Sequence, residues 1–329
     1  MINTGDTAFM LVSCALVLFM TPGLALFYGG MVRRKNVLNT IMSSFVVCGL
    51  ASILWVLIGY SLSFSKDITG LGMLGDLNFF GLNNLDPVSG TIPTIVFVAF
   101  QMMFAIITPA LITGSLAERM KFSALVVFII LWSIVVYYPL AHAVWGADGF
   151  LFKMGALDFA GGNVVHISSG ISGLVLCIIL GKRKGHGALK YQPHNLPLVF
   201  IGAAILWFGW FGFNAGSALG ANDIAANAFM TTNTSAAAAL ISWMIIEKLV
   251  NGKPTMLGAA TGAVVGLVAI TPGAGFVPIW ASIIIGAVVS PLCYFALAVL
   301  KEKLGYDDAL DAFGCHGIGG IWGGIATGL

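Results

Sequence analysis

The chain has 329 residues, of which 59% are hydrophobic and only 9% are charged, with a formal net charge of +2. Soluble domains carry about 25% charged residues, so a surface built from this sequence is suited to lipid and not to water. The small net charge gives no reason to expect nucleic acid as a partner. We therefore predict one membrane domain over residues 1–329 instead of two soluble domains.

Apolar stretches recur along the whole chain, each long enough to cross a hydrocarbon core of about 30 Å as a helix. We interpret the first as a membrane helix and do not expect a signal peptide, because Asp6 is the only charged residue before Arg33 and the stretch exceeds a signal's apolar region. We predict an all-α polytopic membrane protein with ten visible helices. The predicted spans are 8–31, 40–63, 92–115, 122–145, 161–181, 196–219, 225–247, 255–271, 275–300 and 310–329.

The basic residues are concentrated in alternate connections between these spans. Only Lys66 and Lys153 lie in the other set, which includes the long polar segment 64–91. Because basic connections face the cytoplasm, we predict a multi-pass protein of the cell membrane with its N-terminus outside. The basic residues on the predicted cytoplasmic side are Arg33, Arg34, Lys35, Arg119, Lys121, Lys182, Arg183, Lys184, Lys190, Lys248, Lys253, Lys301 and Lys303.

Two segments that lie five spans apart resemble each other. Asp158 precedes His166 by eight residues at the start of the fifth span, and Asp308 precedes His316 by eight residues at the start of the tenth. An odd number of spans per half predicts two halves of opposite orientation, about 1–190 and 191–329. Inverted repeats of this kind place substrate sites near the bilayer midplane. Coincidence between two glycine-rich stretches is the alternative.

Few ionisable side chains fall inside the predicted spans: His142, His166, His316 and, at a span end, Glu247. Ionisable groups in membrane helices are usually functional, and histidine can be neutral near pH 7. Histidines at matching positions of two inverted halves should lie within hydrogen-bonding distance, where they could relay a proton without a permanent charge. A helix-packing role for each histidine is the alternative.

No cofactor or metal is expected. Two histidines without a cluster of carboxylates or thiolates make a poor metal site. The five cysteines have no C-x-x-C spacing and are interpreted as small packing residues. Asp158 and Asp308 lie near helix starts, where a carboxylate accepts hydrogen bonds from free N–H groups. Asp158, on the outer side, could also attract a cation.

Three aromatic groups have small or polar neighbours. Phe100 and Phe104 share one helix face, Trp145 lies at an outer helix end, and Phe213 is one helical turn before Ser217. An aromatic face beside a hydroxyl suits a small cation, through cation–π attraction and one hydrogen-bond acceptor. Core packing is the alternative for each group.

The chain resembles ammonium transporters of the Amt/Mep/Rh family from its first span to its last residue. The segments that carry the resemblance are PGLALFYGG at 22–30, AERMKFS at 117–123, ALDFAGG at 156–162, VVH at 164–166, WFGFNAGS at 210–217 and DAFGCHG at 311–317.

The resemblance implies a homotrimer of eleven-helix subunits, each with its own narrow pore for ammonium. It implies an outer site that binds ammonium at Trp145, Phe104 and Ser217, supported by Asp158. The ion would lose a proton there and continue as NH3.

A gate of two stacked phenylalanines, Phe104 and Phe213, is implied below the outer site. The apolar lumen beneath it would hold a proton relay formed by His166 and His316. K+ cannot be deprotonated, so it would be excluded.

The predicted spans number one fewer than the family's eleven helices, so we expect the C-terminal helix and tail to be missing. The resemblance also implies a cytoplasmic PII-type regulator or a fused signalling domain as further partners. Ammonium transport and ammonium sensing are both candidate functions. An enzyme is not expected, because the sequence has no nucleophile–base constellation and no phosphate-binding loop.

Overall fold

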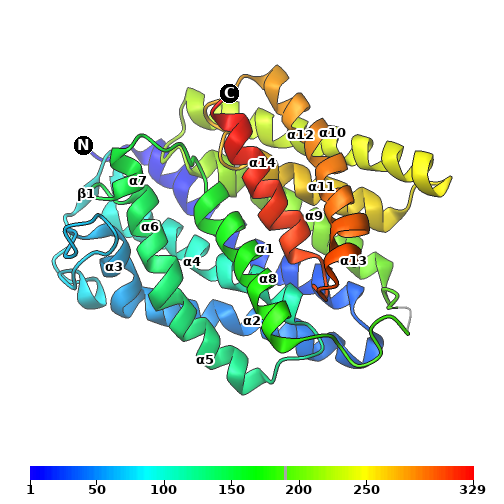
Figure 1. Cartoon of the computed structure of the whole chain (residues 1–329). Coiled ribbons are helices and arrows are strands. Elements are labelled where there is room, and N and C mark those ends of the chain that lie inside the picture. Colours follow the sequence, from blue (N-terminus) through cyan, green and yellow to red (C-terminus); the bar gives the residue numbers. More distant parts are fainter. Residues whose placement is uncertain (189–190) are drawn as a thin grey trace.

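The computed structural model describes residues 1–188 and 191–329, so Lys190 of the predicted cytoplasmic set lies outside the described residues. Most of the described chain is α-helical (Figure 1). The α-helices up to residue 188 are α1 (Thr4–Met31), α2 (Val37–Leu54), α3 (Tyr60–Phe64), α4 (Thr94–Leu116), α5 (Phe122–Trp132), α6 (Tyr138–Trp145), α7 (Phe150–Lys153) and α8 (Ser168–Leu180). Those that follow are α9 (Leu196–Gly216), α10 (Asp223–Asn251), α11 (Met256–Ile270), α12 (Ile279–Phe295), α13 (Lys301–Leu304) and α14 (Ile318–Thr327).

Short elements join these helices. The π-helical turns are η2 (Trp55–Gly59), η4 (Ser133–Tyr137), η5 (Gly162–Ile167), η6 (Ala296–Leu300) and η7 (Phe313–Gly317). The 3-10 turns are η1 (Arg34–Asn36) and η3 (Phe80–Leu82), and an antiparallel pair is formed by β1 (Val88–Ser89) and β2 (Ile92–Pro93). Single π turns inside helices frequently mark functional sites, and both η5 and η7 contain a histidine of the predicted relay.

Eight helical segments of the described residues are long and apolar enough to cross a membrane. The remaining two predicted spans are shorter helices, Met256–Ile270 and the combined η7 and α14. Some predicted boundaries were wrong by several residues. The second helical segment runs from Arg34 to Phe64 because η1 leads directly into α2, and the ninth continues to Leu304. The prediction of an all-α polytopic membrane protein is confirmed.

Side-chain caps fix the start of several helices. Asn3, Asn195, Asn222 and Thr255 each accept a hydrogen bond from a backbone N–H in the first turn of α1, α9, α10 and α11. These residues satisfy N–H groups that have no partner within the helix. Large apolar side chains are exposed along the outer faces of the spans, among them Val135, Ile179 and Leu249, as expected for a surface in lipid.

Helices α1 and α9 pack side by side in the middle of the molecule (Figure 1). Their backbones approach closely at glycines: a Cβ added to Gly202 would clash with the backbone of Phe27, and one added to Gly23 would clash with Ile205. Small residues at helix crossings are the usual device for close packing in membranes. The two helices form one wall of the pore described below.

Contacts divide the connections into two sets on opposite sides. On the side of the N-terminus, Asn3 N–H donates to Thr91 O, and Ala221 N–H donates to Asp6. On the other side, Arg33 pairs with Glu118. Arg183 there pairs with Asp307. This grouping matches the predicted alternation of the connections.

Candidate functional site

An outer cavity of about 200 Å³ opens on the side of the N-terminus. It contains three of the predicted substrate-binding residues, Trp145, Phe104 and Ser217. Its lining is Phe64, Phe97, Gln101, Phe104, Trp145, Phe159, Ser217 and Leu219. A cavity with aromatic walls and two polar side chains can take a small cation.

Two hydrogen bonds orient the predicted binding residues. The Trp145 indole N–H donates to the backbone carbonyl of Asp158 over 2.9 Å, and its ring meets that of Phe104 edge-on at 5.8 Å between centroids. The Ser217 hydroxyl donates to Phe213 O over 2.9 Å. Since this bond uses the hydroxyl's proton, the oxygen of Ser217 is left to accept from a ligand.

Gln101 is a cavity residue that the sequence analysis did not single out. It lies on α4 and lines the outer cavity, and its Oε1 atom is buried without a hydrogen-bond partner among the described residues. An unpaired buried acceptor is unfavourable unless a ligand or a water molecule donates a hydrogen bond to it. Its amide side chain in a predominantly apolar helix was the available signal.

Phe104 and Phe213 lie directly beneath this cavity. Both are buried, and their ring centroids are 4.4 Å apart with an angle of 44° between the planes. The predicted contact between the two rings is present, although they are tilted instead of parallel. Together the rings separate the outer cavity from the interior.

A narrow cavity continues below the two phenylalanines. Apart from the two histidines and the Trp210 indole, its lining consists of apolar side chains. The residues are Met20, Leu24, Phe27, Ile107, Leu111, His166, Leu206, Trp210, Phe213, Val264 and His316. Such a passage offers almost nothing to replace the hydration shell of an ion.

His166 and His316 meet in this cavity. Their Nδ1 atoms are 3.3 Å apart, and the rings are nearly parallel, with 26° between their planes and 5.3 Å between centroids. The predicted hydrogen-bond reach is therefore confirmed. One proton between two Nδ1 atoms makes one ring the donor and the other the acceptor, so both can be neutral.

Glycines one turn after each histidine allow the close crossing of the two segments. A Cβ added to Gly170, four residues after His166, would clash with the backbone of Gly317 beside His316. A Cβ on Gly320, four residues after His316, would press against Gly162 O and His166. The environments of the two histidines are therefore alike in this respect.

The two aspartates of the repeated motif differ in their bonding. The Asp158 carboxylate accepts hydrogen bonds from four successive backbone N–H groups, those of Gly161, Gly162, Asn163 and Val164, at the start of η5. This capping was predicted. Asp308 accepts one, from Phe313 N–H, and its Oδ1 has no partner among the described residues. Asp158 is not among the residues that line the outer cavity. Its connection to the cavity is its backbone carbonyl, which accepts the hydrogen bond from the cavity residue Trp145.

Two further residues contact His166 that the sequence analysis had not assigned to the site. The Thr271 Oγ1 lies 3.3 Å from His166 Nε2, and Trp210 stacks on the imidazole with centroids 5.4 Å apart. Trp210 Nε1–H also donates to Thr271 Oγ1 over 3.0 Å. Trp210 belongs to the WFGFNAGS segment, but nothing local in the sequence marked Thr271.

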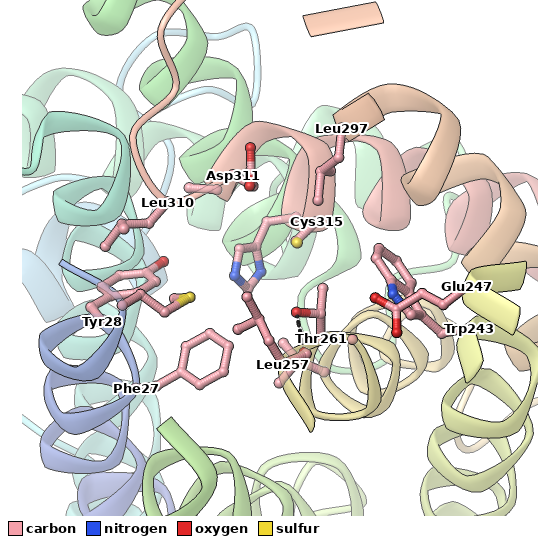
Figure 2. A pocket seen from close by; sticks show the side chains of 15 residues that line it. Phe27, Tyr28, Trp243, Glu247, Leu257, Thr261, Leu297, Leu310, Asp311 and Cys315 are labelled. Atoms are coloured by element: carbon pink, nitrogen blue, oxygen red, sulfur yellow. Dashed lines mark hydrogen bonds between the residues drawn. The ribbon is translucent and has the colours of Figure 1, made fainter. Parts of the chain in front are cut away.

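His316 also lines a second cavity, of about 140 Å³, on the opposite side of the molecule from the outer cavity. Figure 2 shows Phe27 and Tyr28 on one side of it and Trp243 and Glu247 on the other. The Tyr28 hydroxyl donates to Leu111 O, and Glu247 accepts from Thr255. The outer cavity, the phenylalanine pair, the histidine pair and this cavity thus follow one another across the protein.

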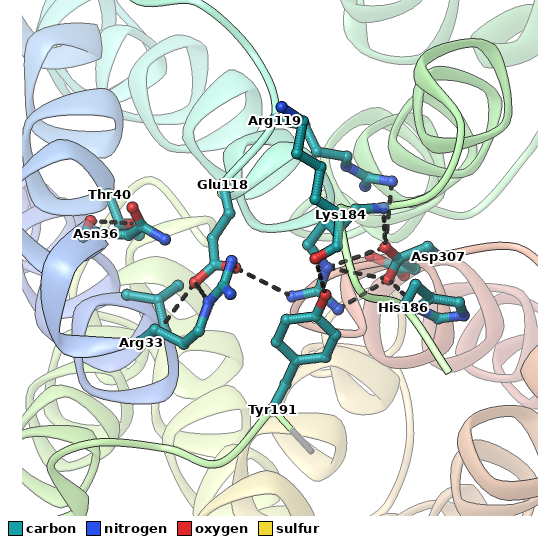
Figure 3. A network of polar contacts seen from close by, with 12 residues as sticks. Arg33, Asn36, Thr40, Glu118, Arg119, Lys184, His186, Tyr191 and Asp307 are labelled. Carbon is teal, nitrogen blue, oxygen red and sulfur yellow. Dashed lines mark hydrogen bonds and ion pairs between the residues drawn. The ribbon is translucent and has the colours of Figure 1, made fainter. Parts of the chain in front are cut away.

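Figure 3 shows a cluster of ionic side chains that includes Arg33, Glu118, Arg119 and Asp307. Arg183 binds Asp307 through Nε and Nη2, and Arg33 binds Glu118 through the same two atoms. Burial opposes ionisation of Asp307, but the hydrogen bonds and charge of Arg183 outweigh it and lower the pKa of Asp307 to about 2. Burial likewise opposes ionisation of Glu118, yet Arg33 lowers its pKa below the usual value. This cluster joins four connections of the predicted cytoplasmic side.

The remaining predicted ionisable residue, His142, lies away from the pore. Its Nδ1 is 3.1 Å from Ser63 O and its Nε2 is 3.6 Å from Asp67, on the side of the N-terminus. Among the described residues, no group of three or more His, Cys, Asp or Glu side chains could hold a metal ion.

The sequence model of the Ammonium Transporter Family matches residues 8–329. An ammonium transporter of Bacillus subtilis is 57% identical over 329 residues, which cover 99% of this chain and 80% of that protein. The crystal structure of Saccharomyces cerevisiae Mep2 superposes with a TM-score of 0.94 at 41% identity, over 100% of this chain and 76% of that one. A structure named Sensor Amt Protein gives a TM-score of 0.92 at 28% identity, over 98% of this chain and 81% of that one. Sequence and structure agree along nearly the whole length, and the chain belongs to the ammonium transporter family.

Proposed function

We propose that this chain transports ammonium by recruiting NH4+ in the outer cavity, removing a proton and conducting NH3 past the two histidines. The observation that carries the proposal is the contact of His166 with His316 inside an otherwise apolar passage closed by Phe104 and Phe213. Membership of a transporter family confirms that the chain is not an enzyme.

Recruitment rests on the outer cavity. Trp145 and Phe104 supply aromatic faces for a cation, and Ser217 and Gln101 supply oxygen acceptors for the N–H groups of NH4+. The Asp158 carboxylate is engaged by four N–H groups, so its first role is structural: it caps η5, and its carbonyl holds Trp145. Its charge is a secondary attraction for the cation.

NH4+ must lose a proton because the passage below the two phenylalanines is narrow and apolar. A bare cation between Phe213 and His316 would lose its hydration without gaining charged partners, which is strongly unfavourable. Ammonium avoids this by crossing as NH3, while the proton is handled by His166 and His316. K+ and Na+ have no proton to release, and the described residues of the narrow passage include no carboxylate.

The proposal includes the arrangement of the chain in the membrane. The basic connections and the ionic cluster support a cytoplasmic location for that side, which puts the N-terminus outside. The matched glycine contacts around the histidines support two inverted halves, about 1–190 and 191–329. A homotrimer rests on the family resemblance, and a PII-type regulator or a fused signalling domain stays a prediction.

Proteoliposomes containing the purified chain test the proposal. We expect ammonium and methylammonium to be taken up and K+ and Na+ to be excluded, and we expect His166→Ala to abolish this selectivity. K+ currents as large as ammonium-induced currents through the unaltered protein would refute the mechanism. Ammonium binding without any flux would identify a sensor instead.

A further inference from the structure

Thr271 lies at the C-terminal end of α11, where its buried hydroxyl oxygen has three polar neighbours. Trp210 Nε1 is 3.0 Å away, Leu267 O is 2.8 Å away and His166 Nε2 is 3.3 Å away. The hydroxyl has one proton and two lone pairs, so the chemistry of these neighbours decides what each contact is.

Two of the three contacts have a fixed direction. An indole nitrogen only donates, so Trp210 occupies one lone pair of Thr271 Oγ1. A carbonyl only accepts, so the Thr271 proton goes to Leu267 O. The backbone supports this assignment. Thr271 N–H donates to Val268 O over 3.2 Å, one residue short of the α-helical partner Leu267 O, and the hydroxyl replaces that donor.

We propose that Thr271 is a positioning residue that sets the tautomers of the histidine pair. Its one remaining lone pair can only accept, so His166 must carry its proton on Nε2. His166 Nδ1 is then the acceptor in the pair, and His316 must donate from Nδ1 over the observed 3.3 Å. The Nε2 atom of His316 then carries no proton and can act as an acceptor towards the second cavity, which His316 lines and which we call the cytoplasmic cavity.

This assignment rests on the proposed function and gives the relay a direction. In an inward transfer, a proton binds His166 Nε2, the proton on His166 Nδ1 crosses to His316 Nδ1, and His316 releases its Nε2 proton to the cytoplasmic cavity. The pair that results has Nε2–H on His166 and Nδ1–H on His316. Thr271 therefore stabilises the state in which the inward transfer is complete.

Nitrogen-15 NMR of histidine-labelled protein in bilayers tests the assignment, because protonated and unprotonated imidazole nitrogens resonate far apart. The signals of the other histidines are identified with His142→Gln, His186→Gln and His194→Gln. We expect the unaltered protein to show Nε2–H on His166 and Nδ1–H on His316. The opposite pattern would overturn the proposal without any variant.

Matched variants separate the hydroxyl from the shape of the side chain. Thr271→Val should shift the tautomer ratio of His166 roughly tenfold towards Nδ1–H, the size of one neutral hydrogen bond. Thr271→Ser should keep the original pattern. Thr231→Val, which removes a buried hydroxyl bonded to Ala274 O, should leave it unchanged. An unaltered pattern in Thr271→Val, or equal shifts in the Ser and Val variants, would show that Thr271 does not set the tautomers.

The readout needs no transport, so it separates this inference from the proposed function. Ammonium flux with the opposite tautomers would reject the role of Thr271 alone. The expected tautomers in a protein that passes no ammonium would support the role of Thr271 and reject transport.

Discussion

Along the pore, the polar side chains carry no fixed charge: Gln101 and Ser217 line the outer cavity, and Thr271, Trp210 and the two histidines lie below it. On the side predicted to be cytoplasmic, by contrast, buried arginines and acids are packed together, and Arg183 and Asp307 are both nearly inaccessible. Each carboxylate there has bidentate contact with a guanidinium. The comparison shows that this fold accepts buried charge where the connections supply an opposite charge, and keeps charge out of the passage.

The physical reasons differ between the two regions. In the ionic cluster, mutual pairing offsets the loss of hydration, and removing one partner would leave a buried charge alone. In the passage, a fixed negative charge would hold a cation and a fixed positive charge would repel it. Neutral imidazoles can exchange protons without either effect. The following variants test this difference, beginning with the largest expected effect.

Asp307→Ala should destabilise the protein by about 3–5 kcal/mol, because Arg119 would lose its acidic partner and Arg183 would keep only the more distant Glu118. Thermal unfolding in detergent measures the loss. Asp148→Ala is the matched control, since Asp148 pairs with Lys153 at an exposed site, and we expect no measurable change there. Equal stability of the two variants would contradict the importance of the cluster.

The same carboxylate predicts a pH dependence. Its pKa in the folded protein, about 2, lies below the ordinary value of 3.8 for an aspartate, so the native state favours the ionised form. The stabilisation is complete above the unfolded pKa and is lost as pH falls from about 4 towards 2. Unfolding measured across this range should show a smaller acid effect in Asp307→Asn than in the unaltered protein.

Phe213→Ala should open the passage below the outer cavity and admit a K+ current that the unaltered protein excludes. Loss of a buried phenylalanine should also lower stability by roughly 3 kcal/mol. Phe211→Ala is the control, because Phe211 is two residues away and stacks on Phe229, outside the pore lining. Liposome flux assays with ammonium and K+ decide the outcome, and identical selectivity in all three proteins would remove the gate role.

Asp158→Asn should fold but lose about 1.5–3 kcal/mol, since an amide NH2 replaces an oxygen that accepts from two backbone N–H groups. Ammonium uptake should weaken, because the variant removes the carboxylate charge that attracts the cation. Asp308→Asn, which alters a carboxylate with one N–H partner, should lose less. Full ammonium uptake by Asp158→Asn would eliminate its contribution to recruitment.

Ser217→Ala should produce the smallest effect, raising the half-saturating ammonium concentration roughly fivefold, as expected for one hydrogen bond of about 1 kcal/mol. Ser217→Thr keeps the hydroxyl and should resemble the unaltered protein. Uptake measured over a range of ammonium concentrations provides the comparison. If the half-saturating ammonium concentration is unchanged in Ser217→Ala, the aromatic faces and not the hydroxyl recruit the ion.

The sequence by itself determined the membrane class, the approximate spans and the histidine pair. These features depend on local composition and on the rarity of ionisable groups in apolar stretches, and both are visible in one dimension. The capping role of Asp158 was also predicted, because a carboxylate just before a helix has N–H groups within reach. The exact ends of the helices were not predicted, because 3-10 and π turns extend several helices without a break in hydropathy.

Only the tertiary structure decided which distant residues meet. Thr271 is one of many threonines in apolar helices until the fold brings its oxygen to Trp210 and His166, and Gln101 becomes a cavity residue only when α4 faces Trp145. Arg183 and Asp307 likewise meet across a sequence separation of 124 residues. Such contacts depend on how helices cross at glycines such as Gly170, where a backbone approach of a few ångströms sets the partners of each buried polar atom.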